Sequence, residues 1–189
     1  MQSKYHGAFV GLAMGDTLGM AIEFKNVDEF EPLTGPVACG PFKLPLGYWT
    51  DDTSMALCLA DSLIELGGYD SYNVMDKYWD WRANGYRSST EHCFDIGNQT
   101  STAINAYKQH PIVSKNMERD SSAGNGSIMR LAPAVIASHS AGNSLEQTMT
   151  LCSATARETH YSFEAEAGTA LFGAMLYNAF DVKDKNKIF

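Results

Sequence analysis

The chain has 189 residues, 44% of them hydrophobic and 19% charged, which is typical of one globular domain, expected over residues 1–189. The net charge of −8, with no basic block to offset it, argues against a nucleic-acid partner. No apolar run has membrane-spanning length and no signal-peptide pattern is present, so no membrane partner is expected. Scattered cysteines without a CxxC pair are typical of reduced thiols and predict a cytoplasmic protein.

The first predicted element is a buried helix from Tyr5 to Leu18, rich in small and apolar residues. Asp16 lies within it, and a carboxylate in so apolar a setting needs hydrogen-bonding partners. We therefore interpret Asp16 as a satisfied structural group rather than a catalyst. Glu23 lies a few residues further on, where the chain should emerge from this helix.

A long loop is predicted over residues 25–48, because four prolines interrupt the segment and exclude a continuous helix. Loops of this length without structure of their own often act as lids or binding loops. Glu23 would then stand at the root of a mobile flap.

The second predicted helix runs from Ser54 to Leu66, with apolar residues at three- and four-residue steps and Gly67-Gly68 as its stop signal. Thr50 is a plausible N-cap, which places Asp51 and Asp52 in the first turn, where the helix dipole favours anions. Two interpretations stay open. The residues form either an ordinary acidic helix start or a set of oxygen ligands for a hard cation such as Mg²⁺.

The rest of the chain predicts further helices, and strand signals are nearly absent. We therefore expect an all-α protein, a compact multi-helix bundle of about seven or eight helices around one core. Pro133 should end one short helix and begin the next, and Ser162 is the natural N-cap of the longest helix. The expected helices cover Tyr72–Asn84, Thr100–Gln109, Ala134–Ser138, Leu145–Arg157 and Phe163–Phe180.

Three polar features outside the helices are candidates for chemistry. Asp95 lies between Phe94 and Ile96 and is either a capping group or an acid in a partly dry site. His160 lies in a connection before the last helix rather than on an apolar face, which favours contact with a ligand. A glycine-rich turn is either an ordinary turn or a nest of backbone N–H groups for phosphate. That turn consists of Gly124, Asn125, Gly126 and Ser127.

Taken together and in order, these motifs closely resemble the ADP-ribosylglycohydrolase family, over about residues 5 to 180. The resemblance implies a compact all-α fold that carries two Mg²⁺ ions, or Mn²⁺ in some members, and removes ADP-ribose from a modified protein or small molecule. The matching segments are Gly15-Asp16-Thr17-Leu18-Gly19 with Glu23, Thr50-Asp51-Asp52-Thr53, Phe94-Asp95-Ile96-Gly97, Gly124-Asn125-Gly126-Ser127 with Met129-Arg130, and Thr159-His160.

The resemblance also implies roles for individual residues. Thr50, Asp51 and Asp52 match the family's first set of metal ligands. Asp95 and Glu23 match acidic residues with catalytic or gating roles. The turn at 124–127 matches the loop that holds the diphosphate, and His160 matches a histidine near the bound ADP-ribose.

One part of the family pattern has no match in this sequence. Family members carry a second acidic motif, Asp-x-Asp-Thr/Ser, and Asp181-Val182-Lys183-Asp184 has neither its spacing nor its hydroxyl residue. The second set of metal ligands is therefore missing. Three explanations stay open: a longer glycohydrolase of which this is the N-terminal part, a short form without metal binding, or completion by another chain. An incomplete helical core should expose apolar surface and favour self-association.

The functional expectation is a Mg-dependent hydrolase of ADP-ribosylated substrates that cleaves an N- or O-glycosidic bond. The alternatives are a truncated, inactive ADP-ribose-binding module and a helical interaction protein in which the motifs are relics.

Overall fold

The computed structural model describes residues 1–189 except 39, 114–121, 183, 185–187 and 189. Within the described residues the fold is all-helical and has no sheet, as predicted. The elements are α1 (Gln2–Gly19), the short 3₁₀ turn η1 (Val27–Glu29), α2 (Asp51–Leu66), α3 (Ser71–Asn84), α4 (Asn98–Gln109), α5 (Ala132–Ser140), α6 (Leu145–Ala156) and α7 (Phe163–Asp181).

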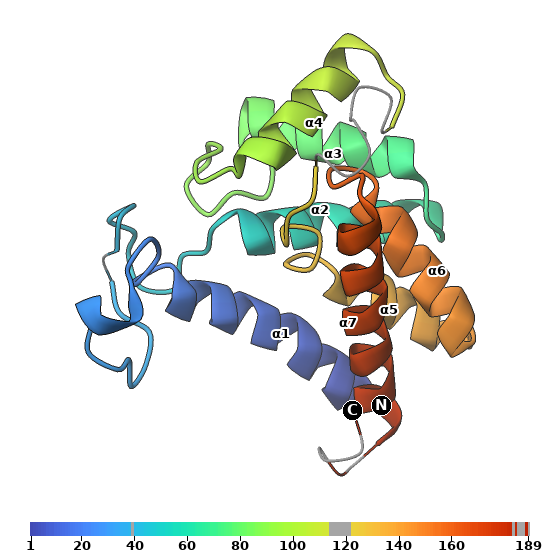
Figure 1. The fold of residues 1–189 in the computed structure, drawn as a ribbon, viewed down its shortest axis with the longest axis horizontal. Coiled ribbons are helices and arrows are strands. Elements are labelled where there is room, and N and C mark those ends of the chain that lie inside the picture. The colour runs from blue at the N-terminus through green and yellow to red at the C-terminus, as the bar shows by residue number, and fades with distance from the viewer. Residues whose placement is uncertain (39, 114–121, 183, 185–187, 189) are drawn as a thin grey trace.

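Helix α2 crosses the middle of the molecule, with α3 and α4 on one side of it and the group α5, α6 and α7 on the other (Figure 1). The apolar spacing that predicted this helix is the reason for its position. Met55, Leu59 and Leu63 recur on one face and are buried in the central core, because that face packs against α3 and α5. The aromatic residues Tyr78 and Trp81 of α3 complete this core, as the sequence suggested.

Helix α1 differs from the prediction. It forms over the expected residues, but the expected burial is wrong: only Asp16 and Thr17, near its C-terminal end, are buried. Val10 is 58% exposed and Met14 is 44% exposed. The reason is that α1 packs along a single narrow face against α2, α5 and α7. The small residues of α1 therefore do not indicate that other helices pack against it on several faces.

The two ends of the helical array lie side by side (Figure 1). The ammonium group of Lys4 donates hydrogen bonds to the backbone oxygens of Ala179 at 3.1 Å and Phe180 at 2.7 Å. A third bond, to the oxygen of Val182, measures 3.1 Å. Because the last carbonyls of a helix lack partners within it, this cation caps the C-terminus of α7 and ties α1 to it.

Helix boundaries follow the sequence signals with one exception. Gly67 ends α2 with a φ of 63°, a left-handed conformation that glycine adopts without strain, and the Ser162 hydroxyl caps α7 by accepting from the Ala165 N–H at 3.0 Å. The short helix expected before Pro133 is absent, and residues 126–130 form a turn instead. Pro133 lies in the first turn of α5, where a backbone N–H would have no acceptor within the helix, so proline costs no hydrogen bond there.

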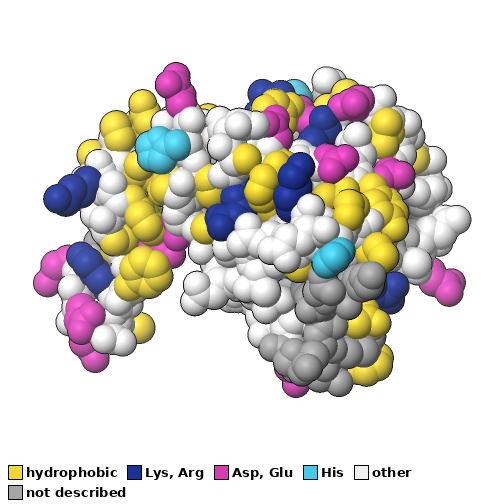
Figure 2. Space-filling model, turned by 90° about the horizontal axis from the view of Figure 1, so that it is seen from above, with side chains coloured by type: hydrophobic (Ala, Val, Ile, Leu, Met, Phe, Trp, Pro, Cys, Tyr) yellow, Lys and Arg dark blue, Asp and Glu magenta, His cyan; other side chains and the backbone are white. Residues whose placement is uncertain are grey.

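The long loop between α1 and α2 is confirmed, with η1 as its only regular element among the described residues. Asn26 and Glu29 bond reciprocally around η1 and stabilise this turn. In the space-filling view the loop forms a lobe that a notch separates from the body of the molecule (Figure 2). None of the helices, over the residues described, is long and apolar enough to cross a bilayer.

Candidate active site

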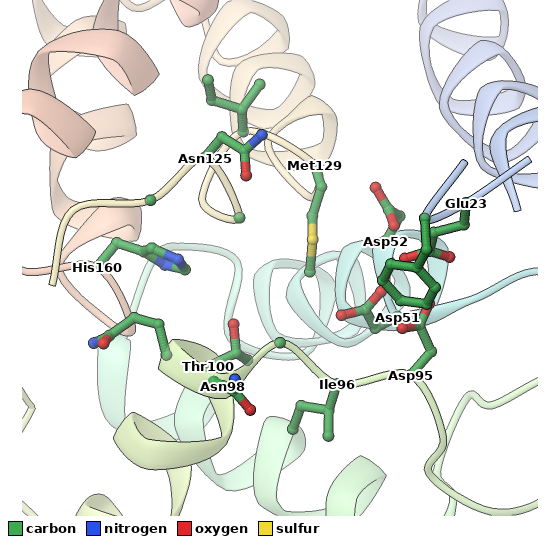
Figure 3. Close-up of a pocket in the computed structure, with 16 residues that line it drawn as sticks. Glu23, Asp51, Asp52, Asp95, Ile96, Asn98, Thr100, Asn125, Met129 and His160 are labelled. Carbon is green, nitrogen blue, oxygen red and sulfur yellow. The ribbon is translucent and has the colours of Figure 1, made fainter. Parts of the chain in front are cut away.

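Most of the residues singled out in the sequence meet in one cavity of about 680 Å³ (Figure 3). Its walls come from the turn that follows α1, the start of α2, the segment entering α4, the turn before α5 and the connection before α7. The predicted residues that line it are Glu23, Asp51, Asp52, Asp95, Gly124, Asn125, Gly126 and His160. Thr50 and Ser127 are buried beside the cavity and do not line it.

One end of the cavity is acidic. Glu23, Asp51, Asp52 and Asp95 line it, and no lysine or arginine is among the lining residues. Burial and the neighbouring carboxylates, Asp52 foremost, raise the pKa of Asp51 to about 9. Burial and the charge of Asp16 also raise the pKa of Asp52. Two adjacent carboxylates are therefore held in proximity without a compensating cation from the protein.

Asp16 explains how this acidic segment is held. One carboxylate oxygen accepts from the Thr50 hydroxyl at 2.7 Å, and the other accepts from the Thr53 hydroxyl at 2.6 Å and the Thr53 N–H at 3.0 Å. The Thr50 N–H lies 3.1 Å from both oxygens. A side chain of α1 thus caps the N-terminus of α2, and the structural role predicted for Asp16 is confirmed.

Thr50 occupies the N-cap position of α2, as predicted, but its side chain accepts no hydrogen bond from the helix N–H groups. Its hydroxyl points away from the helix N–H groups, because it donates to Asp16 at 2.7 Å and lies 3.2 Å from a carboxylate oxygen of Asp52. Thr50 therefore links the structural carboxylate of Asp16 to an acidic residue that lines the cavity.

Glu23 and Asp95 form a hydrogen-bonded carboxyl pair at the mouth of the acidic end. Burial, then the charge of Asp95, raises the pKa of Glu23 to about 7, and burial followed by the charge of Asp52 raises the pKa of Asp95 to about 6. Both carboxyl groups therefore bind a proton more readily than isolated ones. Asp95 has a φ of 47° and Phe24, next to Glu23, a φ of 64°. Such left-handed conformations are costly for residues other than glycine and cluster at functional sites.

The opposite end of the cavity is built on the turn at 124–127 and on His160, and no carboxylate lines it among the described residues. The imidazole of His160 lies directly against the turn. A Cβ atom at Gly124 would lie 3.1 Å from ring atom Cδ2, and one at Gly126 would lie 2.9 Å from ring atom Cε1. Glycine is required at both positions because this ring fills the space of a side chain. Ser127 faces the other way, with its hydroxyl 2.7 Å from that of Thr169 on α7.

Met129 lies between the two ends and points into the cavity from the turn (Figure 3). Residues that sequence reasoning missed lie opposite it, at the start of α4, where Gly97 occupies the N-cap and no side chain caps the helix. The sequence could have indicated them, because a glycine N-cap before Asn98 has no side chain to accept hydrogen bonds from the first N–H groups of the helix. The missed residues that line the cavity are Asn98, Gln99 and Thr100.

The family comparison agrees with this arrangement. The model of the ADP-ribosylglycohydrolase family matches residues 1–189. The chain belongs to the ADP-ribosylglycohydrolase family. The ADP-ribosylarginine hydrolase Tri1 of Pseudomonas putida (strain GB-1) is 40% identical over 182 residues, which cover 96% of this chain and 48% of that protein. Tri1 of Serratia proteamaculans (strain 568) is 37% identical over 98% of this chain and 50% of its own length.

More distant relatives carry the same family name. The glycohydrolase of Rhodospirillum rubrum named for ADP-ribosylated dinitrogen reductase is 31% identical over 91% of this chain and 56% of its own length. A solved ADP-ribosylglycohydrolase-related protein complex superposes with a TM-score of 0.79 at 35% identity, covering 99% of this chain and 59% of that one. The chain therefore spans about half the length of the curated relatives it matches.

The family implies Mg²⁺, and the donor chemistry at the acidic end fits such an ion. Asp51 and Asp52 offer hard carboxylate oxygens with raised pKa values, and a dication would relieve the repulsion that raises them. The set is partial: among the described residues, no three His, Cys, Asp or Glu side chains form a group arranged to hold a metal ion. Asp51 and Asp52 therefore do not by themselves make a complete ligand set among the described residues.

Proposed function

We propose that this chain supplies the ADP-ribose site of a Mg-dependent hydrolase that cleaves the glycosidic bond between ADP-ribose and a protein side chain or small molecule. One observation carries the proposal. The acidic segment at 51–52 and the glycine turn at 124–126 line the same cavity, although more than seventy residues separate them in the chain. A ribose at the acidic end and a diphosphate at the turn would occupy both ends of this cavity together.

The neutral end suits the diphosphate. The turn has no side chain at Gly124 and Gly126 to obstruct its backbone, and the uncapped N-terminus of α4 lies across the cavity. Helix N-termini and turns of this kind bind phosphate through their N–H groups. Among the residues that the structure describes, no carboxylate at this end would repel the anion. Binding the diphosphate here would hold the attached ribose at a fixed distance, over the carboxylates.

The acidic end suits the chemistry of glycosidic cleavage. As the bond to the anomeric carbon breaks, positive charge develops on the ribose, and the carboxylates of Asp51, Asp52 and Asp95 would stabilise it. The raised pKa values of Glu23 and Asp95 suit this pair to donate a proton to the departing group and to accept one from water. Thr50, Asp51 and Asp52 would hold the Mg²⁺, which when bound orients ribose hydroxyls and activates water.

The relatives point to the substrate class. Those with the highest identity above are named ADP-ribosylarginine hydrolases, and another is named for ADP-ribosylated dinitrogen reductase. We infer that arginine-linked ADP-ribose is the first substrate to test. Three free cysteines among the described residues, Cys58, Cys93 and Cys152, support the cytoplasmic setting expected from the sequence.

The test is release of ADP-ribose from an ADP-ribosylated arginine substrate, with Mg²⁺ and with a chelator. Mg-dependent release supports the hydrolase. A second candidate, an ADP-ribose-binding module without turnover, is favoured by the partial ligand set. Calorimetric binding of ADP-ribose without release would support it. Binding of neither ADP-ribose nor ADP, together with no release, would refute both functions.

A further inference from the structure

A buried cation lies beneath the glycine turn and is not used by the chemistry above. Arg130 is fully buried, and its guanidinium lies 5.1 Å from the ring centre of Tyr78. Its acidic partner is Glu158, also buried, with one carboxyl oxygen 3.5 Å away and the other accepting from the Tyr69 hydroxyl at 3.0 Å. Burying such a pair costs free energy unless its remaining hydrogen bonds are used well. The acceptors of the guanidinium hydrogen bonds therefore indicate the role of Arg130.

The guanidinium donates to three acceptors that come from different parts of the site. One nitrogen donates to the backbone oxygen of Gly126 at 3.2 Å. The other donates to the backbone oxygen of Thr155 at 3.2 Å and to the hydroxyl of Thr159 at 2.7 Å. Because the guanidinium is rigid and planar, it fixes the turn and the end of α6 relative to each other. The shortest of these bonds goes to Thr159, next to His160.

The hydroxyl of Thr159 also lies 2.8 Å from the Nδ1 atom of His160. Arg130 can only donate hydrogen bonds, so it occupies a lone pair of this hydroxyl and leaves its proton free for a second partner. That proton can then be given to Nδ1 of His160. An Nδ1 atom that accepts a hydrogen bond carries no proton, so in the neutral ring the proton is on Nε2.

The Nε2 atom faces the turn. It would lie 3.2 Å from a Cβ atom at Gly124 and 3.1 Å from one at Gly126, which places it at the edge of the ring between the two glycines. We propose that Arg130, acting through the Thr159 hydroxyl, fixes the orientation and tautomer of His160 so that its Nε2–H is a hydrogen-bond donor to a phosphate oxygen on the turn. Arg130 and Thr159 are then positioning residues. This inference rests on the proposed function for the identity of the phosphate ligand.

The charge state of His160 supports this assignment. Its side chain is buried, and burial followed by the positive charge of Arg130 lowers its pKa to about 4. The ring therefore stays neutral near pH 7, and its single proton is available on one nitrogen. Because His160 is neutral and holds its proton on one nitrogen, it can donate a hydrogen bond to an anion without first binding another proton.

Nitrogen-15 NMR of the imidazole rings, in the full chain, tests the tautomer directly. His160→Gln identifies the resonances of this ring. The expected result at pH 7 is a protonated Nε2 and an unprotonated Nδ1 shifted by an accepted hydrogen bond. Thr159→Val removes the hydroxyl at nearly constant volume and should add a population with the proton on Nδ1. Thr159→Ser should keep the tautomer of the unmodified chain, because it restores the hydroxyl.

Calorimetry with ADP-ribose measures the consequence for binding. Thr159→Val should weaken the affinity about tenfold, the value of one well-placed hydrogen bond to an anion, whereas Thr159→Ser should stay within about threefold. Thr148→Val is a matched control, because its buried hydroxyl bonds Ser144 and Ser138 away from His160. It should leave both the tautomer and the affinity unchanged.

Two outcomes overturn the inference. The first is an NMR spectrum of the unmodified protein in which Nδ1 of His160 carries the proton. This outcome can be observed without any variant. The other is a folded Thr159→Val protein with an unchanged tautomer and an unchanged affinity. Failure of the proposed function looks different, because the unmodified chain would then show the expected tautomer and bind no ADP-ribose.

Discussion

Replacing Asp16 by asparagine should destabilise the protein while leaving its shape almost unchanged, because asparagine has nearly the same volume. Both carboxylate oxygens of Asp16 accept hydrogen bonds, from the hydroxyls and backbone N–H groups of Thr50 and Thr53. An amide offers one oxygen and one NH₂ group, so the NH₂ faces donors that a carboxylate oxygen had accepted from: the Thr50 hydroxyl at one position, or the hydroxyl and N–H of Thr53 at the other. Both threonines are only 3% exposed, so water cannot replace the lost acceptor.

The magnitude follows from the bonds lost. A buried donor of Thr50 or Thr53 left without its acceptor costs about 1–3 kcal/mol, and loss of the charge from the remaining bonds adds about 1 kcal/mol. We expect a decrease of about 3 kcal/mol in the free energy of unfolding. For a chain of this length, this corresponds to a fall in Tm of about 6–12 °C.

The assay is thermal unfolding followed by circular dichroism, with Asp70→Asn as the matched control. Asp70 caps α3 locally, its carboxylate accepting from the N–H groups of Tyr72 and Asn73 at 2.9 Å. Asparagine is an equally good N-cap, so the same change there should shift Tm by less than about 2 °C. Equal Tm values for Asp16→Asn and the unmodified chain would show that the carboxylate does not hold α2 as argued.

Three further predictions concern the cavity and its support. Gly126→Val should abolish ADP-ribose binding in calorimetry, because the new side chain collides with His160, whereas Gly68→Val, with open space around it, should bind normally. Asp51→Ala should abolish Mg-dependent release of ADP-ribose and any rise of Tm on adding Mg²⁺, and an unaltered rate would remove Asp51 from the site. Burial raises the pKa of Glu158 to about 7 from 4.5 in an unfolded chain, so the folded state keeps a proton that the unfolded state loses. Stability should therefore fall as pH rises from 5 to 7, and Glu158→Gln should make this slope less steep by about 1.4 kcal/mol per pH unit in chemical denaturation. Parallel curves for the two proteins would contradict the assignment.

Local pattern was sufficient to predict most of the helices, whereas the cavity residues were identified through the family resemblance, and Asn98, Gln99 and Thr100 were missed. The three- and four-residue steps in α2 predict its buried face, and Gly67 predicts its end. Burial of Asp16 in an apolar helix was enough to predict a structural role, since an unpartnered carboxylate there would be too costly. The identity of its partners was not predictable, because Thr50 and Thr53 are more than thirty residues away and only the packing of α1 on α2 brings them together.

What the sequence could not show was burial and long-range bonding. The small residues of α1 suggested close neighbours, but composition does not reveal how many faces of a helix are covered. Arg130 was visible only as part of a motif, because nothing in the chain indicates that it is fully buried against Glu158. Likewise the contact of His160 with Gly124 and Gly126 arises from two loops that meet only in the folded protein.

The uneven charge along the cavity has a consequence for how a modified macromolecule would arrive. An elongated ligand with a single anionic segment would be favoured in one orientation, since its negative part is disfavoured by the four acidic side chains and accepted beside His160. Under the proposed function, the group attached to the ribose would lie near Glu23 and Phe24, and Phe24 is 78% exposed. A bulky target would approach over the lobe that follows α1, and its shape there would govern which modified sites are accessible.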